Sequence, residues 1–351
     1  MCYDERTSTA PSSPMTATES EDAFAFVKQL QTRLKDRGFD ICSPFRVSDY
    51  NAKAKRHPLP DFEVPDALGL VIGCTKTFWP KFIDWLFAQY QQQQQPNPEE
   101  DDESNRTTSR EDEKEKQQKQ QVNTTAGTGP RQRVVVPTLR RGTVIKDPVD
   151  TWCKTAVEGV LAEEPFASSR YDLRFDWHGP RGGKYVHIQT AGHVTGHFPY
   201  DQDTMWCCHP EYGVWFVFRC VVVFDLPFPS HLPEPPKQLL SIMPEAAKLE
   251  IKQWTAVACK EGWRNAATLL RIRDACPIGK ERWRYDGDVL AYFYPVEESK
   301  SDVLWRVLCA VAKEKGLSGT TAEEQALEEE NKKKKKMERS EKEEEEEILT
   351  T

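Results

Sequence analysis

The chain has 351 residues, a formal net charge of −8 and ten cysteines. Two low-complexity segments hold the negative charge: residues 96–119 contain 9 acids and 5 bases, and residues 323–347 contain 12 acids and 7 bases. They contribute −4 and −5, so the rest sums to +1, which argues against a basic nucleic-acid-binding surface. The cysteines form no C-x-x-C pair, and there is no apolar signal region and no run of transmembrane length. We therefore expect a cytoplasmic protein with reduced thiols that binds neither nucleic acid nor membrane.

The first folded segment is predicted to begin with a helix. Thr18-x-x-Glu21 has the pattern of a capping box, apolar residues then recur at helical spacing, and Gly38 stands where a C-terminal cap belongs. Residues 67–75 form an apolar run of strand length. An aromatic helix is expected after it, with a buried face made of Phe82, Ile83, Leu86 and Phe87.

The composition then changes abruptly. Residues 91–133 are rich in Gln and charged residues and have no periodic apolar positions, which is typical of disorder. Asp147-Pro148-Val149-Asp150 is typical of a helix start, with Asp147 as the cap. The predicted organisation is a disordered lead (1–17), a single domain (18–90 and 134–318), a disordered insertion (91–133) and a charged low-complexity tail (319–351).

Strands are expected in the middle of the chain. Residues 171–177 and 185–190 are predicted to form two strands around the hairpin turn Gly179-Pro-Arg-Gly-Gly183. Residues 214–224 do not alternate in polarity, which favours a strand buried on both faces. Beyond a proline-rich crossing at 227–236, helices are predicted over 245–260 and 302–315. The elements together indicate an α+β fold.

Histidines and cysteines gather in two loops before the buried strand. His193 and His197 have zinc-like spacing, and Cys207-Cys208-His209 adds soft ligands, but glycines interrupt the helix that would align the histidines. Histidines hydrogen-bonded to backbone are the alternative. A cysteine nucleophile also stays open, because Cys207 would share a strand face with His209. A packed, inert thiol is the commoner state of cysteine beside an apolar run.

Two arginines stand in unusual places. Arg219 is the single charge inside the predicted buried strand, where a cation is unfavourable unless an anion meets it. Arg264 follows Gly262-Trp263 at an expected helix end. A structural ion pair is one explanation for each. Together they fit a small anionic ligand, such as a peptide that carries carboxylates.

Several blocks, taken in order, resemble the CblC family of intracellular cobalamin-processing enzymes (MMACHC-type cyanocobalamin reductase and alkylcobalamin dealkylase). In the first half these blocks are Gly38-Phe39-Asp40, Pro44-Phe45-x-Val47, Tyr50-Asn51, His57-Pro-Leu-Pro60 and Leu70-Val-Ile72. In the second half they are Asp147-Pro-Val-Asp150, Gln189-Thr-Ala-x-His-Val-x-Gly196, Cys208-His-Pro-x-x-Gly-x-Trp-Phe-x-x-Arg219 and Ala291-Tyr-Phe293. The resemblance covers about residues 24–90 and 147–308.

The resemblance implies a nitroreductase-like flavin-reductase fold, with a mixed, mainly antiparallel sheet packed with helices. It also implies an apolar cavity that takes cobalamin in the base-off form, with the benzimidazole tail displaced from cobalt. Members of the family use reduced flavin (FMN or FAD) to remove cyanide from cyanocobalamin, and glutathione to remove alkyl groups from alkylcobalamins. Loss of the lower ligand makes both reactions easier, so the protein's task is to position and desolvate the reactants.

By position, the resemblance assigns residues to each ligand. The cobalamin contacts are Asp176, Val186, His187, Ile188, Gln189, Tyr200, Gln202, Cys207 and Phe218. Arg219, Arg264 and Lys300 are assigned to the glutathione carboxylates, and His193 and His209 to a supporting loop. No metal ligand from the protein is implied.

Some positions depart from the family pattern. Lys300 replaces an arginine and so lacks the two-pronged geometry for a carboxylate. Asp201 replaces a tyrosine, and the loop from Tyr200 to Trp206 is shortened. A non-catalytic cobalamin chaperone and a flavin oxidoreductase of unrelated substrate are the alternative functions. The resemblance further implies a monomer or a flavin-dependent homodimer, and a downstream cobalamin-trafficking protein as a partner.

Overall fold

A computed structural model describes residues 17–93, 145–232 and 241–316. The predicted lead, insertion and tail lie outside these residues, apart from residue 17 and residues 91–93. Contacts divide the chain into two units, Met1–Trp85 with Ile145–Leu304 and Leu86–Val144 with Trp305–Thr351. The described part of the second unit is the end of one helix and most of another, and the sheet and the cavity described below belong to the first unit. Within the described ranges, no helix is both long and apolar enough to cross a membrane.

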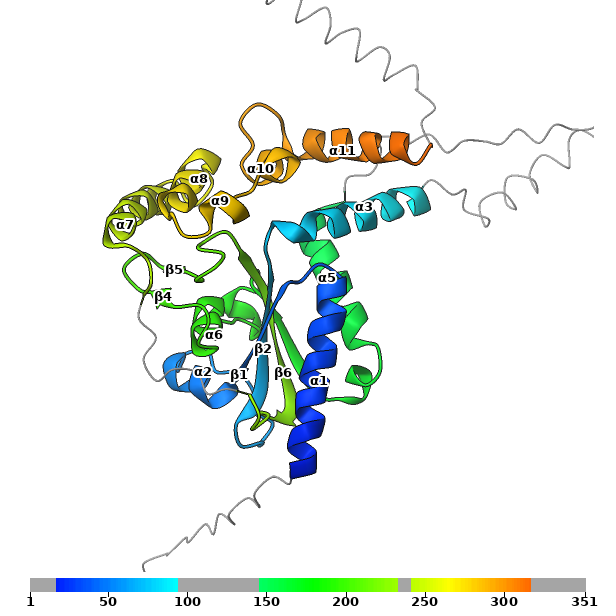
Figure 1. The fold of residues 1–351 in the computed structure, drawn as a ribbon, viewed down its shortest axis with the longest axis vertical. Helices are drawn as coiled ribbons and strands as arrows, with labels where there is room; N and C mark the ends of the chain where they lie inside the picture. Colours follow the sequence, from blue (N-terminus) through cyan, green and yellow to red (C-terminus); the bar gives the residue numbers. More distant parts are fainter. Residues whose placement is uncertain (1–16, 94–144, 233–240, 317–351) are drawn as a thin grey trace, which may run out of the picture. The chain divides into compact units, whose positions relative to one another are not determined.

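A four-stranded sheet forms the centre of the first unit (Figure 1). Its strands are β1 (Ile41–Arg46), β2 (Ala67–Cys74), β6 (Val217–Pro227) and β3 (Tyr171–Phe175), in that order, and all neighbours are antiparallel. Every residue of β2 is buried, as is β6 from residue 218 to residue 224. The expected antiparallel α+β architecture is therefore confirmed, with the two least polar strands at its centre.

Helices cover both faces of this sheet. On one face lie α1 (Ala17–Asp36) and α5 (Pro148–Leu161), which contact each other; Phe26 of α1 meets Phe224 of β6 at 5.0 Å between ring centres. The other face carries the short helices α2 (Val47–Lys53) and α6 (Ile188–Val194), which share an apolar cluster with Val221 and Val223 of β6. The alternation of β6 thus supplies two separate cores.

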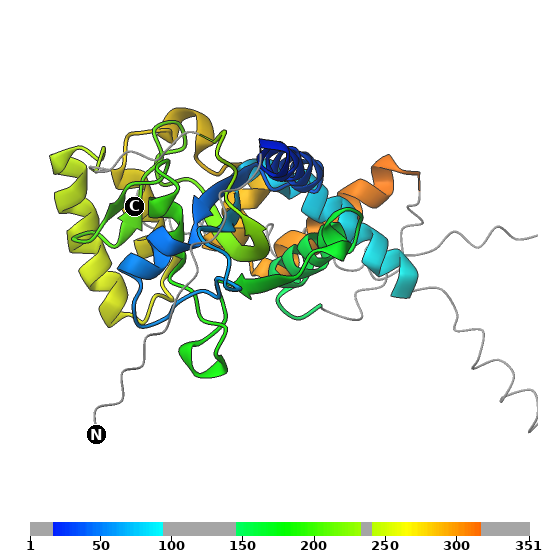
Figure 2. The same ribbon diagram turned by 90° about the horizontal axis from the view of Figure 1, so that it is seen from below.

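A second apolar cluster lies beyond the sheet. The helices α7 (Glu245–Lys260) and α8 (Ala266–Ala275) pack on each other and on the segment that precedes β6, through Ile251, Ile272 and Val214. Both views show this pair lying apart from α1 and α5 (Figure 2). The remaining elements include α3 (Trp79–Gln93), the two-residue strands β4 (Tyr200–Asp201) and β5 (Trp206–Cys207), and three further helices: α9 (Lys280–Trp283), α10 (Gly287–Phe293) and α11 (Lys300–Glu314).

Most of the expected elements are confirmed. The strand at 67–75 and the helices at 245–260 and 302–315 match β2, α7 and α11 within two residues, and the buried strand begins at Val217 instead of 214. Two cap predictions are wrong. The helix already includes Thr18, and Asp147 has a left-handed backbone (φ 46°) with no side-chain cap bond.

The second predicted strand, 185–190, is also wrong, and so is the hairpin. Ile188 begins α6, and Pro180–Gly182 is a short 3-10 turn. Val186 and Ile188 alternate with polar residues as in a strand, but the buried positions Ile188, Ala191 and Val194 follow helical spacing. His187 starts the helix, because its ring nitrogen accepts a hydrogen bond from the backbone N–H of Thr190.

Candidate ligand-binding site

A cavity of about 260 Å³ lies on the α6 side of the sheet. It is bounded by α6, by β5, by the residues that enter β6, and by the α7–α8 pair. Most of its lining is apolar, including Ile188, Val214, Phe216 and Phe218. Polar groups come from Asp176, Gln189 and Arg273. A mainly apolar hollow with a few converging polar groups is typical of a small-molecule site.

The floor of the cavity depends on the contact of α6 with β6. Gly192 in α6 faces the ring of Phe218, and a Cβ atom at position 192 would lie 2.4 Å from that ring. Only glycine therefore lets the helix approach the strand so closely. This contact brings Ile188 and Gln189, at the start of α6, beside Phe218.

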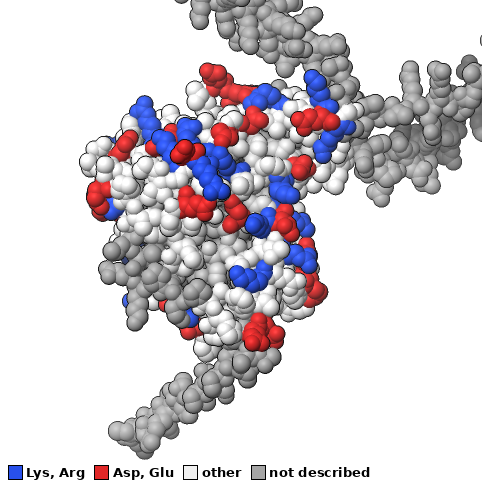
Figure 3. Space-filling view, in the orientation of Figure 1, with Lys and Arg blue, Asp and Glu red and all other residues white. Residues whose placement is uncertain are grey.

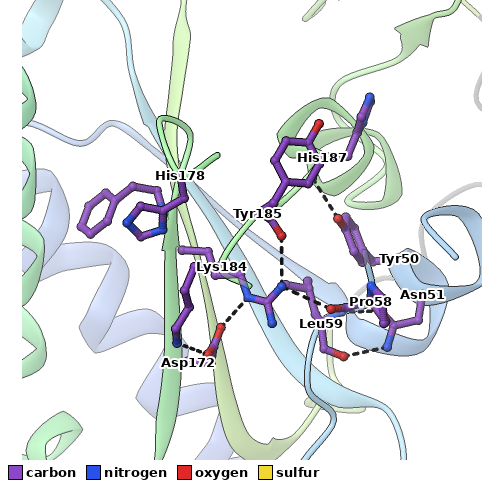
Figure 4. Close-up of polar contacts among 11 residues, drawn as sticks. Tyr50, Asn51, Pro58, Leu59, Asp172, His178, Lys184, Tyr185 and His187 are labelled. Atoms are coloured by element: carbon purple, nitrogen blue, oxygen red, sulfur yellow. Dashed lines mark hydrogen bonds and ion pairs between the residues drawn. The ribbon is translucent and has the colours of Figure 1, made fainter. Parts of the chain in front are cut away.

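An arginine clamp fixes the segment that leads into α6 (Figure 4). Arg174 is buried, pairs with Asp172 at 2.7 Å, and donates hydrogen bonds to the carbonyl oxygens of Pro58 (3.2 Å) and Tyr185 (3.0 Å). Burial alone would raise the pKa of Asp172, but its bonds to Lys184 and Arg174 outweigh burial and lower it. The segment enters α6 in a fixed position as a result.

A tyrosine adds a second tie to the same segment. The Tyr50 hydroxyl accepts a hydrogen bond of 2.9 Å from the backbone N–H of His187 (Figure 4). Asn51, the next residue, bonds both the N–H and the carbonyl of Leu59. Two of the sequence blocks, Tyr50-Asn51 and His57–Pro60, therefore fix the segment that precedes α6. They do not belong to the lining of the cavity.

Nine residues were assigned to cobalamin from the sequence, and the structure divides them. Five line the cavity: Asp176, Ile188, Gln189, Cys207 and Phe218. Tyr200 and Gln202 instead line a second cavity of about 270 Å³, together with Lys53, Thr190 and His193. His187 caps α6, and Val186 is buried in the apolar cluster below it.

The cysteines and histidines near the cavity are in inert states. Burial raises the pKa of the Cys207 thiol above its ordinary value, so this thiol is neutral at physiological pH. Burial lowers the pKa of His209 to about 4, and its ring accepts hydrogen bonds from the N–H groups of Glu211 and Tyr212. His193 accepts one from the N–H of Tyr200. Both histidines thus support loops, and the neutral thiol disfavours a Cys207 nucleophile.

The zinc alternative lacks a ligand set. In the part of the chain that the structure describes, no group of three or more His, Cys, Asp or Glu side chains is arranged to hold a metal ion. Cys208, the second cysteine of the pair, lies beside Cys276 instead, with 3.9 Å between the two sulfur atoms.

A β-bulge determines where Arg219 points. The pairing of β2 with β6 shifts between Ile72 and Gly73, so that Arg219 is the extra residue between Phe218 and Cys220. Strict alternation from Val221 would place Arg219 on the cavity side; the bulge turns it to the α5 side and leaves Phe218 in the cavity. Gly73 permits this, since a Cβ atom there would lie 2.6 Å from the carbonyl oxygen of Val217.

On the α5 side, Arg219 meets an acid. Its side chain is 8% exposed, and one guanidinium nitrogen lies 3.7 Å from a carboxyl oxygen of Asp150. Its Nε is buried without a hydrogen-bond partner among the described residues. Burial raises the pKa of Asp150 more than the attraction of Arg219 lowers it. The expected anion beside Arg219 is therefore present within the protein itself.

Asp176 connects the two sides of β6. It lines the cavity, and its carboxyl also feels the charge of Arg219. The surrounding protein desolvates this carboxyl and raises its pKa to about 6, which exceeds the opposite effect of Arg219. The residue keeps solvent contact, so water moderates the shift. The cavity thus contains one acid whose charge changes close to neutral pH.

The other two predicted anion-binding residues, Arg264 and Lys300, are exposed. Arg264 lies in the turn between α7 and α8, beside Trp263, which lines the cavity. The Nζ atom of Lys300 lies 5.5 Å from the centre of the Tyr292 ring. Its positive charge opposes the rise in the pKa of Asp150. Positive and negative side chains are interspersed over the face seen in Figure 3.

Arg273 is a residue that sequence reasoning missed. It lines the cavity with an 8% exposed side chain, and Nη1 donates hydrogen bonds to the carbonyl oxygens of Val214 and Phe216. The rings of Trp206, Trp215 and Tyr285 surround its guanidinium at 5.4–5.7 Å. No carboxylate pairs with it among the described residues. The sequence could have indicated that Arg273 is buried, because it follows Leu269 by four residues and so lies on the apolar side of α8.

The chain was compared with protein families, curated proteins and solved structures. No protein-family model matches the chain, and no curated protein matches it in sequence. A solved structure with a similar fold is that of a B12-trafficking protein CblC from C. elegans, described as a homologue of human MMACHC. The likeness covers 81% of this chain and 96% of that chain, with 17% identity and a TM-score of 0.48.

Proposed function

We propose that this protein processes cobalamin and holds it in the cavity beside α6. The observation that carries the proposal is the convergence of Asp176, Ile188, Gln189, Cys207 and Phe218 on one hollow. These residues come from four separate segments, and the family resemblance assigned all of them to the same ligand. Side chains that merely filled a core would have no reason to leave this space open.

The lining suits a corrin ring in its chemistry. The ring is flat and largely apolar, while its edge carries amides that need hydrogen-bond partners. Ile188, Phe216 and Phe218 offer apolar surface, and Gln189 offers an amide at the start of α6. None of the described residues that line the cavity is a histidine, and Cys207 is a neutral thiol. The described lining therefore offers cobalt no imidazole or thiolate in place of the displaced benzimidazole, which suits a base-off complex with the lower position unfilled.

The proposed reactions are reductive removal of cyanide and transfer of alkyl groups to glutathione, on a fold of the nitroreductase type. Bound flavin would supply the electrons for the first reaction. The apolar lining with one cation, Arg273, is compatible with a flat ring that carries an anionic tail. The chain's own part is to exclude water from the cavity and to orient the reacting groups there.

The anionic co-substrate would meet the cations near the cavity. We assign Arg273 to this role beside the predicted Arg219, Arg264 and Lys300, because it lines the cavity and pairs with no carboxylate among the residues that the structure describes. Arg219 acts on the cavity through the charge of Asp176. A flavin-dependent homodimer, a downstream trafficking partner and a cytoplasmic location are further parts of the same proposal.

A spectroscopic titration tests the proposal. Cyanocobalamin or methylcobalamin added to the purified protein should shift to the base-off spectrum, and an unchanged spectrum would refute cobalamin processing. A matched pair of variants locates the ligand: Gln189→Ala should weaken binding, whereas Gln202→Ala, which alters the second cavity, should do so less. The opposite order would place the corrin in the second cavity.

A non-catalytic chaperone is the competing function. It is favoured by Lys300, which lacks the two-pronged geometry of arginine, and by the short turn between β4 and β5. Anaerobic turnover separates the two functions. With reduced FMN or FAD and cyanocobalamin, or with glutathione and methylcobalamin, an enzyme releases product repeatedly. A chaperone binds the same cobalamin base-off and leaves its upper ligand in place.

A further inference from the structure

Two large apolar side chains lie exposed at the edge of the cavity. Met205 follows the turn after β4 and is 41% exposed; Trp263 follows α7 and is 43% exposed. Both belong to the lining of the cavity. An exposed tryptophan and an exposed methionine add little to the stability of an isolated domain, and both border one cavity, where a ligand would contact them.

Both residues also have an unfavourable backbone conformation. The φ angle is 63° at Met205 and 60° at Trp263, in the left-handed region that favours glycine. A bulky residue in this region is destabilising, and such positions occur where the side chain has a function. At each position glycine would relieve the backbone and remove an exposed apolar side chain. The sequence has a bulky residue at both positions nevertheless.

The two turns are held in place by hydrogen bonds. The N–H of Trp263 donates to the carbonyl of Ala258 at 2.8 Å, and the N–H of Met205 donates to that of Asp201 at 2.8 Å. The Thr255 hydroxyl of α7 donates to the carbonyl of Thr204 at 3.5 Å, so α7 is tied to the residue before Met205. The two side chains are thus displayed by ordered turns.

We propose that Met205 and Trp263 form a rim against which the face of a planar conjugated ligand lies. The cavity, at about 260 Å³, is smaller than the roughly 300–1,000 Å³ of pockets that enclose drug-sized molecules. A corrin, or the isoalloxazine ring of a flavin, must therefore extend to the mouth and contact the residues there. An indole ring and a polarisable thioether are well suited to a flat π-system. Both ligands belong to the proposed function, the corrin as its substrate and the flavin as its electron donor, so each is titrated separately.

Substitution by glycine gives a signature that a structural role would not give. Trp263→Gly and Met205→Gly should each raise Tm, by about 2–4 °C for a domain of this size, because they relieve the left-handed backbone. The same variants should weaken ligand binding by about fivefold, the effect of losing one aromatic contact at Trp263 or one thioether–ring contact at Met205. Glu63→Gly is the matched control: Glu63 is exposed with φ 64° and lies outside the cavity, so only Tm should rise.

Kd for cyanocobalamin and for FMN would be measured by absorbance and fluorescence titration of the wild type and the three variants. Weaker binding of cyanocobalamin alone places the corrin on the rim, and weaker binding of FMN alone places the flavin there. If the wild type binds FMN but no cobalamin, the proposed function fails. The rim is then tested by comparing the Kd for FMN of the wild type with that of the variants. Unchanged affinities, binding of neither ligand, or a fall in Tm that accompanies the loss of affinity would each overturn the rim.

Discussion

The two sides of β6 at its bulge differ in every property that matters for function. On the α6 side, Phe218 lies under Gly192 and borders an open cavity. On the α5 side, one residue further, Arg219 is buried and lies 3.7 Å from a carboxyl oxygen of Asp150. The comparison teaches that adjacent residues of one motif serve different purposes. One forms part of the lining of the cavity, and the other is a buried charge paired with an acid on the opposite side of the strand.

The strongest test of this comparison is Arg219→Ala. Removal of a buried cation leaves Asp150 unpaired and a void beside Cys74 and Cys153, and we expect a loss of about 3 kcal/mol in unfolding free energy. The measurement is urea unfolding followed by circular dichroism. At temperatures where the variant is folded, base-off binding of cobalamin should persist while demethylation by glutathione weakens.

Equal loss of corrin binding and of demethylation would show that Arg219 acts only through the fold. The control is Arg33→Ala: Arg33 pairs with Glu163 at the surface, with a 45% exposed side chain. Such exposed pairs contribute between about 0 and 1 kcal/mol. If both arginine variants lose the same small amount, the α5 side does not depend on its buried charge, and the contrast between the two sides of β6 disappears.

On the α6 side, Gly192→Ala should have the next largest effect. The new methyl group would press on the ring of Phe218 at 2.4 Å, and overpacking of this kind costs about 1–3 kcal/mol. Phe218 would move toward the cavity, so the affinity for cobalamin should fall with the stability. Thermal unfolding and the same spectroscopic titration measure the two effects.

Gly159→Ala is the matched control for this variant. Gly159 is also a helix residue, in α5, but no atom lies within 4 Å of the position that its Cβ would take. Alanine there should stabilise the protein by about 0.5–1 kcal/mol, since glycine is a weak helix former. Stabilisation by both substitutions would mean that α6 and β6 are not in close contact, and that the cavity floor is formed in another way.

The same comparison explains how far the sequence could predict the structure. The apolar run of β6, the buried run of β2 and the helical spacing of α7 each record burial directly, and all three were predicted. The bulge at Arg219 was not, because no pattern of polarity announces one extra residue in a strand. The start of α6 was mistaken for a strand, since Val186 and Ile188 alternate over too few residues to distinguish the two periods.

The candidate site shows the same limit. The family resemblance assigned Asp176, Gln189 and Phe218 to one ligand, and the structure brings them to one cavity. The blocks could not separate Tyr200 and Gln202 from this group, because the separation depends on which side of α6 each loop passes. Arg273 was missed although a buried arginine had been noticed at Arg219. A charge in an apolar helix stripe is less conspicuous than one in an apolar strand.

The smallest expected effect concerns Asp176, which links the two sides. Its pKa is raised from 3.8 to about 6 in the folded state, so folding favours the protonated acid. The stability of the wild type should therefore fall as the pH rises from about 4 to about 6, and stay at the lower level above that. Asp176→Asn removes the charge and with it this loss of stability.

The unfolding free energy of the Asp176→Asn variant, relative to that of the wild type, should therefore increase between about pH 4 and about pH 6. The increase should be modest, because water reaches the carboxyl group of Asp176 in the wild type. Urea unfolding at closely spaced pH values measures the difference. A constant difference from pH 4 to pH 7 would mean that Arg219 balances the desolvation of Asp176, and the acid would then be charged in the cavity at every physiological pH.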